Sequence, residues 1–456
     1  MPQPSNPMQP ATAATPSTPS KQPGAARIAI HGDLLDFSAA PAWAEPESTA
    51  VRWRPDHWLL IEDGRIAGVQ ALPPGPEWQR IDHRGRLVLP GFIDAHVHCP
   101  QIDMIASYGA ELLDWLQTYT FPAELRHADP DFAAAGAKRF TDALLAHGTT
   151  AAVVMPTVHK ASTDALFAAA QARGMRLVAG KVLMDRHAPA GLTDDVEQAE
   201  RDCRELIERW HGRDRLSYAV TVRFAPTSSP AQLAMAGTLC KEDPTLYAHT
   251  HVAENRDEVR WVAELYPEAR SYLDVYARAG LLHRRSVLAH GIWLDAEDHA
   301  ALADSGAVLA HSPSSNLFLG SGLFDWTALA ARGAAIAMAS DVGAGTSLSM
   351  QRTLADAYKV QALRGQRLTA WSALYAATRG AARALALEDE IGSFDPGCTA
   401  DVCVWDWARG SVPERRDELA RSLHERVFAW LVLSDERNLV SARVAGVERF
   451  RRNDPP

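Results

Sequence analysis

The 456-residue sequence has few cysteines, no long apolar run and no excess of basic residues. Its five cysteines are scattered, odd in number and form no CxxC motif, which argues against a disulfide framework or a cysteine zinc site and favours a reducing cytosol. No apolar run approaches the roughly 20 residues of a membrane-spanning helix, so we expect no membrane association. The net charge of −10 argues against nucleic-acid binding, which needs a basic face.

The opening segment, 1–25, also lacks the features of a folded or targeting segment. It is rich in Pro, Ser, Ala and Thr, and it has no apolar stretch of the kind that a signal peptide requires. We expect a disordered tail and a cytoplasmic protein.

Short strands are predicted near both ends of the chain, at Arg27–Phe37, Trp58–Gln70 (with a turn at Asp63-Gly64), Gly392–Trp407 and Ser441–Phe450. Because chain termini often meet in compact folds, we predict that 26–86 and 390–456 together form one small β-sandwich domain.

The middle of the chain, 87–389, alternates short apolar runs with helical patterns. Eight such runs occur, at Leu87–His98, Thr149–Thr157, Arg176–Asp185, Leu216–Pro226, Leu246–Glu254, Ser286–Trp293, Ala307–Ser312 and Ala335–Val342. Nearly continuous apolar strands between helices indicate a parallel sheet covered on both faces, and eight units are what a closed (β/α)₈ barrel needs. The alternative is an open doubly wound sheet, but no glycine-rich phosphate loop follows the first strand.

The first of these strands ends in DAHVH, directly after Pro90-Gly91. Residues two apart in a strand face the same side, so His96 and His98 both point to the mouth of a barrel, where the active sites of this fold lie. Two imidazole nitrogens suit one zinc ion. The motif alone is weak, because the chain has 17 histidines and a second HxH at His249 and His251. Its place at the end of an apolar strand is what favours a metal site.

Polar residues end three later strands as well. His251 lies nearest the mouth on the fifth strand, Glu254 follows it, and His249 one layer deeper is interpreted as a buried, hydrogen-bonded histidine. The sixth strand ends at His290 and the eighth at Asp341. A carboxylate in such a position is by itself more often a helix cap. However, five polar residues meet on one rim, and this joint placement predicts a metal centre: His96, His98, His251, His290 and Asp341.

Six segments together resemble the guanine deaminases, a group within the amidohydrolase superfamily. They are PGFIDAHVHCPQ (90–101), LLDWLQTYTFPAE (112–124), HTHVAENRDEV (249–259), LAHGIWL (288–294), AHSPSSNLFLGSG (310–322) and SDVGAGTSLSM (340–350). The resemblance runs from about residue 55 to 440 and leaves the proline-rich start outside. Its HxH, HxxE, AHG and final Asp elements belong to the whole superfamily, whereas LLDWLQTYTFPAE and the HxHxPQ extension point to guanine deaminases in particular.

The resemblance implies hydrolytic deamination of guanine to xanthine and ammonia by a homodimeric, cytoplasmic enzyme with one zinc ion per chain. It implies zinc ligands at His96, His98, His251 and Asp341, with Glu254 as proton shuttle. It also implies a hydrogen bond from His290 to the zinc-bound water, for which the alternative is that His290 is itself a zinc ligand. Gln101, Arg223 and Phe224 match positions that bind the purine, beside His98, His251 and Glu254. For Arg223 the alternative is a salt bridge at the strand end, and for the metal the alternative is iron, which the same ligands can hold.

Two other functions stay open at this point. A different amidohydrolase, such as a cytosine or triazine deaminase or a chlorohydrolase, would keep the same metal site and differ only in the pocket. A catalytically silent binding protein would have lost Glu254 or a ligand, yet all of these residues are present.

Overall fold

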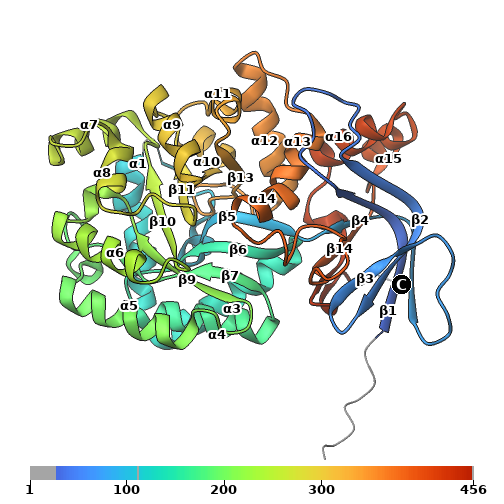
Figure 1. The fold of residues 1–456 in the computed structure, drawn as a ribbon, viewed down its shortest axis with the longest axis horizontal. Coiled ribbons are helices and arrows are strands. Elements are labelled where there is room, and N and C mark those ends of the chain that lie inside the picture. The colour runs from blue at the N-terminus through green and yellow to red at the C-terminus, as the bar shows by residue number, and fades with distance from the viewer. Residues whose placement is uncertain (1–26, 110–111, 454–456) are drawn as a thin grey trace, which may run out of the picture.

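The computed structural model describes residues 27–109 and 112–453, so the predicted tail, 1–25, lies outside the described residues. Two sheets organise the described chain. One is the barrel sheet in the left half of Figure 1, and the other combines strands from both chain ends on the right.

The barrel sheet is built from parallel strands in the order β13-β12-β11-β10-β9-β7-β6-β5, with β8 paired to β9. Its strands are β5 (Phe92–His98), β6 (Thr149–Met155), β7 (Arg176–Ala179), β8 (Val182–Leu183), β9 (Leu216–Val222), β10 (Tyr247–Val252), β11 (Ser286–His290), β12 (Val308–His311) and β13 (Ala335–Met338). Beyond β13 the ring is joined at its carboxyl end, because Asp341 N donates to His96 O at 2.9 Å and His98 N donates to Val342 O at 2.8 Å. The predicted (β/α)₈ barrel is confirmed.

Helices follow the barrel strands and cover the sheet (Figure 1). They are α1 (Leu112–Trp115), α2 (Phe121–Leu125), α3 (Pro130–Ala146), α4 (Lys160–Arg173), α5 (Val196–Trp210), α6 (Pro230–Glu242), α7 (Arg256–Leu265), α8 (Tyr272–Arg278), α9 (Ala296–Ser305), α10 (Pro313–Phe318), α11 (Trp326–Ala331), α12 (Met350–Leu363), α13 (Ala370–Ala376) and α14 (Arg379–Ala384). Two further helices, α15 (Ser411–Glu418) and α16 (Leu423–Leu433), come after the barrel in the chain, and α16 packs on α12 and α13. Many begin at a capping side chain; Asp129, for example, accepts hydrogen bonds from the backbone N–H groups of Asp131 and Phe132. Among the described residues, no helix has both the length and the apolar character needed to cross a membrane.

The second sheet has seven strands in the order β16-β15-β14-β4-β1-β2-β3. They are β1 (Arg27–Phe37), β2 (Val51–Glu62), β3 (Arg65–Gln70), β4 (Gln79–Pro90), β14 (Val402–Trp405), β15 (Leu439–Val444) and β16 (Val447–Arg451). The predicted turn at Asp63-Gly64 joins β2 to β3. Strand β14 from the end of the chain pairs antiparallel with β4 from its beginning, so the predicted sheet built from both termini is confirmed.

Four predicted strands differ from the structure by more than their ends, and one of them, Arg176–Asp185, is divided into β7 and β8. Leu87–His98 is not one strand: its first part is the end of β4, and β5 begins after Gly91. A side chain at Gly91 would collide with Thr150, since a Cβ there would lie 2.1 Å from Thr150 Oγ1, and this close approach marks the passage of the chain between the two sheets. Likewise Gly392–Trp407 is strand only in β14, and Ser441–Phe450 is a hairpin of β15 and β16 that turns at Ala445-Gly446.

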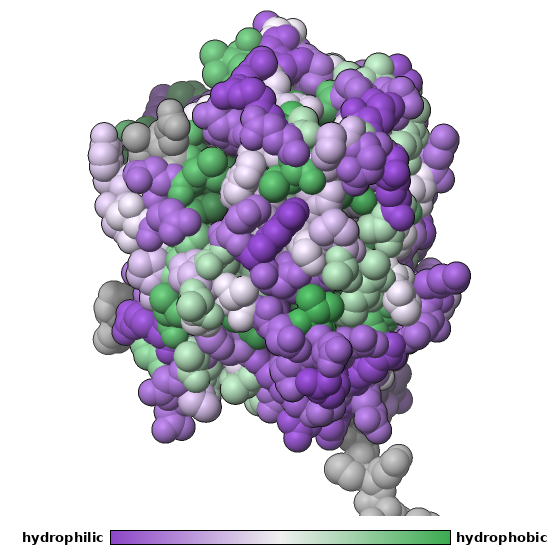
Figure 2. All heavy atoms as spheres, turned by 90° about the vertical axis from the view of Figure 1, so that its left-hand side faces the viewer, coloured by the Kyte–Doolittle hydropathy of each residue, from purple (hydrophilic) through white to green (hydrophobic). Residues whose placement is uncertain are grey.

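An apolar cluster fills the barrel below the site. It joins residues early in several strands, such as Ile93, Tyr247 and Val287, to Ala381 on α14 and Leu385 just after it. The polar residues at the carboxyl ends therefore rest on a packed floor. On the face shown in Figure 2, hydrophilic side chains dominate and hydrophobic ones lie in small separate groups.

Candidate active site

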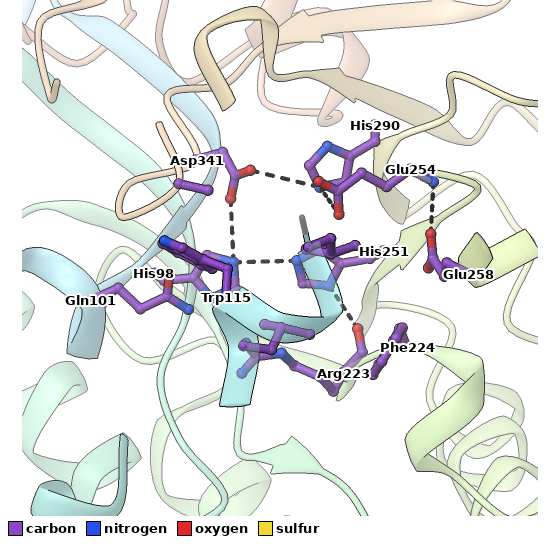
Figure 3. A pocket seen from close by; sticks show the side chains of 13 residues that line it. His98, Gln101, Trp115, Arg223, Phe224, His251, Glu254, Glu258, His290 and Asp341 are labelled. Carbon is purple, nitrogen blue, oxygen red and sulfur yellow. Dashed lines mark hydrogen bonds and ion pairs between the residues drawn. The ribbon is translucent and has the colours of Figure 1, made fainter. Parts of the chain in front are cut away.

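The predicted site residues meet in one pocket at the carboxyl ends of the barrel strands (Figure 3). The pocket has an empty volume of about 410 Å³. It is lined by His98, Gln101, Leu112, Trp115, Leu116, Arg223, Phe224, His251, Glu254, Glu258, His290, Asp341 and Ala344. His96, fully buried, is in contact with several of these residues.

Four imidazoles and one carboxylate converge at the base of this pocket. Asp341 Oδ1 lies 3.1 Å from His96 Nε2 and 3.4 Å from His98 Nε2, and His251 Nε2 lies 3.2 Å from His98 Nε2. His290 Nε2 lies 3.7 Å from Asp341 Oδ2. One ligand atom each from His96, His251, His290 and Asp341 lies within 4.8 Å of the others. The structure thus brings together all five residues expected on the rim.

Neighbouring groups hold the second ring nitrogen of three of these histidines. His251 Nδ1 lies 2.7 Å from the backbone oxygen of Arg223, His96 Nδ1 lies 2.7 Å from His249 Nε2, and His290 Nδ1 lies 2.9 Å from Asn316 Oδ1. A backbone carbonyl only accepts hydrogen bonds, so Nδ1 of His251 carries the proton. The interpretation of His249 as a buried, hydrogen-bonded histidine is confirmed.

This arrangement fits a bound cation. Burial lowers the pKa of His96 to about 4 and that of His251 well below its usual value, which keeps both rings neutral. A neutral ring protonated at Nδ1 directs a lone pair from Nε2. The Nε2 atom of His251 lies 3.2 Å from His98 Nε2, so its lone pair faces a second ring nitrogen, which itself lies beside the carboxylate of Asp341. Neutral imidazoles and a carboxylate are zinc ligands, and partners at Nδ1 are what orient metal-binding histidines.

Glu254 lies beside this cluster, three residues after His251. Its Oε2 is 3.4 Å from His290 Nε2, its Oε1 accepts a hydrogen bond from Ser321 Oγ at 3.2 Å, and its backbone N–H donates to Glu258 Oε2 at 2.9 Å. Burial raises the pKa of Glu254 to about 7. Burial acts in the opposite direction on His290, but the carboxylates of Glu254 and Asp341 leave its pKa raised. A carboxyl group with a pKa near 7 can both take up and release a proton at neutral pH.

Hydrogen-bonding side chains also line the wall of the pocket beyond the histidines. Arg223 Nη1 donates to Glu124 Oε1 at 2.5 Å, and Gln101 Nε2 donates to the same oxygen at 3.2 Å. Arg223 therefore lines the pocket and also forms the salt bridge that was its alternative interpretation. The ring of Phe224 and the side chains of Leu112 and Trp115 supply apolar surface to the same pocket.

Two buried carboxylates of this site were not predicted, Glu124 and Glu258. Both lie inside segments that carry the resemblance, and for Glu124 nothing in the spacing of one sequence distinguishes it from an exposed acidic residue. Glu258 completes the capping box of α7 with Asn255 and accepts a hydrogen bond from Tyr272 Oη at 2.6 Å. The pattern N-x-x-E at 255–258 was the available signal, because it marks a helix start that follows the strand end directly.

Comparison with known proteins places the chain in a family. Residues 87–441 match the model of the amidohydrolase family. The guanine deaminase of Escherichia coli (strain K12) is 42% identical over 430 residues, which cover 93% of this chain and 98% of that protein. The structure of E. coli guanine deaminase superimposes with a TM-score of 0.89 at 40% identity, over 94% of this chain and 99% of that one.

A structure of guanine deaminase from C. acetobutylicum with guanine bound in its active site is also similar. Its TM-score is 0.84 at 27% identity, over 93% of this chain and 100% of the other. The family match, the sequence identity and the coverage point to the same kind of protein as the geometry of the pocket does. The chain belongs to the amidohydrolase family and, within it, to the guanine deaminases.

Proposed function

We propose that this protein hydrolyses guanine to xanthine and ammonia. The observation that carries the proposal is that one pocket joins a cluster suited to a metal ion, a carboxyl group with a pKa near 7 and a wall of hydrogen-bond donors beside an aromatic ring. Similarity to guanine deaminases over almost the whole chain supports it.

In this proposal His96, His98, His251 and Asp341 hold one zinc ion. His290 shares the cluster through its approach to Asp341 and is proposed to hydrogen-bond the attacking water. When bound, zinc lowers the pKa of a water molecule from about 15.7 to about 7, which supplies a nucleophile at neutral pH.

Glu254 moves the protons, and Asp341 orients the attacking water. Glu254 takes a proton from the attacking water and delivers it to the ring nitrogen beside C2, while Asp341 accepts a hydrogen bond that orients the water. The new C–O bond makes C2 tetrahedral. The water's remaining proton then passes to the amine, the C2–N bond breaks, ammonia leaves and C2 becomes the carbonyl of xanthine. The raised pKa of Glu254 and its approach to His290 support this role.

The wall of the pocket selects the substrate. Guanine has a carbonyl oxygen at C6 and a ring N–H next to it, whereas adenine has an amine at C6. Arg223 only donates hydrogen bonds, so it suits that oxygen and opposes an amine. Gln101 can donate or accept, and Phe224 can stack on the flat purine, which contributes about 0.5–1.5 kcal/mol beyond area burial.

We expect guanine to be preferred over adenine and cytosine by at least about 10³-fold in kcat/KM, because a site built around polar groups rejects a substrate that leaves them unpaired. Release of ammonia from each base, measured on the same preparation, tests this. Equal kcat/KM for guanine and cytosine would reduce the proposal to an amidohydrolase of another substrate.

We expect Arg223→Met to lower kcat/KM for guanine by at least about 10²-fold while the metal content stays at the wild-type level. Arg223 contributes only its backbone oxygen to the histidine cluster, and the substitution keeps the backbone. Losing one hydrogen bond to a charged group costs about 1.5–3 kcal/mol, and the unpaired carbonyl of guanine adds to this. An unchanged kcat/KM would remove Arg223 from the substrate site.

The division into domains is also a proposal: 26–86 with 390–456 as the small domain, and 87–389 as the catalytic domain. The backbone hydrogen bond from Ile66 N to Cys398 O supports the grouping of the two chain ends. Strand β4 pairs with β14 through Leu87–Pro90, so the small sheet extends four residues past the proposed boundary at 86. The homodimer and the cytoplasmic location stay predictions. Analytical ultracentrifugation tests the homodimer, and cell fractionation tests the location.

A further inference from the structure

Glu124 is a buried carboxylate that reaches the site from a different part of the chain than the barrel strands. It lies on α2, next to the segment whose residues Leu112, Trp115 and Leu116 line the pocket, and its exposed fraction is 0%. Its Oε1 accepts hydrogen bonds from both Arg223 Nη1 and Gln101 Nε2. One oxygen atom therefore links the two polar side chains that are proposed to recognise the purine.

The contact determines how Arg223 can act. A buried guanidinium needs a nearby negative charge, since burial of an unpaired ion costs several kcal/mol. Glu124 supplies that charge at 2.5 Å and engages one end of a rigid, planar group. Fixing one nitrogen of a planar fork also fixes the directions of its other N–H donors, and Arg223 lines the pocket. Without Glu124 the guanidinium would lose both its counter-ion and its orientation.

The same contact orients the amide of Gln101. The backbone N–H of Gly343 donates to Gln101 Oε1 at 3.2 Å, so this atom must be the oxygen, and the amide nitrogen faces Glu124 at 3.2 Å. Gln101 is thus held between the loop after β13, which carries Asp341, and α2. A rotation of the amide by 180° would break both of these hydrogen bonds, to Gly343 and to Glu124.

We propose that Glu124 is the positioning residue that determines selection of a carbonyl oxygen at C6 of the purine. It acts through Arg223 and Gln101, and it makes no contact with the reacting atoms at C2. The inference rests on the proposed function, because it assumes that these two side chains face a purine. It explains why the LLDWLQTYTFPAE segment ends in a glutamate that is buried beneath the pocket wall.

The test compares two bases that carry the same amine at C2. Guanine has an oxygen at C6, whereas 2-aminopurine has only hydrogen there. We expect Glu124→Gln to lower kcat/KM for guanine by about 30-fold or more, because Arg223 then loses the charged partner that directs its other donors toward the C6 oxygen. The affinity for 2-aminopurine, followed by its own fluorescence, should change by less than about 3-fold. Metal content should stay constant.

Asp401→Asn is the matched control. Asp401 is also a buried carboxylate paired with an arginine, Arg215, at 2.6 Å, but it lies outside the pocket and its partner does not line the pocket. This variant should keep both the wild-type kcat/KM for guanine and the wild-type affinity for 2-aminopurine, and therefore the ratio of the two. If Glu124→Gln does not fold, Glu124→Asp withdraws the carboxylate by one methylene, keeps the charge and should shift the ratio in the same direction.

A double variant separates positioning from general damage. Because Glu124 acts through Arg223 and Gln101, adding Glu124→Gln to Arg223→Met should lower kcat/KM for guanine by clearly less than the roughly 30-fold that Glu124→Gln causes alone, and the remaining loss is the part that acts through Gln101. The inference would be overturned if Glu124→Gln lowered the affinity for 2-aminopurine by the same factor as kcat/KM for guanine, or if it lowered neither. Failure of the wild-type protein to release ammonia from guanine would instead overturn the proposed function.

Discussion

We expect Glu254→Gln to lower kcat for guanine by about 10⁴-fold or more while the fold and the bound metal are kept. The amide cannot take up or release a proton, so both proton transfers that depend on Glu254 fail, and a single positioned transfer is typically worth about 10²–10⁴-fold. Folding should be kept because the side chain makes one hydrogen bond that an amide can also accept, from Ser321 Oγ. Steady-state kinetics with elemental analysis of the same sample checks this.

Glu264→Gln is the matched control, since Glu264 lies on the nearby helix α7 with an exposed side chain. It should leave kcat unchanged. If Glu254→Gln kept more than about a tenth of the wild-type rate, Glu254 would not be the acid–base group and the proton would have to pass through another residue.

We expect His96→Ala and Asp341→Ala each to lose the bound metal. Each variant should also have a kcat/KM for guanine that is lower than the wild-type value by more than about 10⁴-fold. Asp341 Oδ1 lies close to both His96 and His98, so loss of either His96 or Asp341 opens the centre of the cluster. With the ion gone, the water regains its pKa of about 15.7 and the nucleophile is lost at neutral pH. Elemental analysis and ammonia release on each variant test this.

Comparison with Glu254→Gln distinguishes loss of the metal from loss of the acid–base group. Glu254→Gln should keep the metal without activity, whereas His96→Ala should lose both. Chelation of the wild-type protein should abolish ammonia release, and added zinc should restore it. A fully active preparation without any transition metal would refute the metal hypothesis.

Much of this site could be predicted from the sequence because its residues stand at regular places in a repeating pattern. These residues lie near the carboxyl end of an apolar strand or just past it, and parallel strands bring their carboxyl ends to one rim: His96, His98, His251, His290 and Asp341. The boundaries at Leu87–His98 could not be predicted, since β4 and β5 are separated only by Gly91 and both are apolar where they meet. Periodicity does not show that the chain passes from one sheet to the other.

The partners of the predicted residues required the structure. Glu124 and Arg223 are 99 residues apart, and His96 and His249 are 153 apart, so no local pattern connects them. Glu124 lies in the short helix α2, after α1 and a π-helical turn (Leu116–Thr120), and this change of helix type means that residue spacing does not predict the face on which its side chain lies.

By itself, the sequence determined the barrel, the sheet shared by the two termini and the residue types at the strand ends, because these follow from apolar periodicity and from the order of the segments. Only the tertiary structure decided which carboxylate accompanies Arg223, which nitrogen of His251 faces the cluster, and that Glu258 holds the backbone of Glu254. These contacts depend on side chains from distant segments meeting in three dimensions, where burial and hydrogen bonding select one partner among many acidic residues.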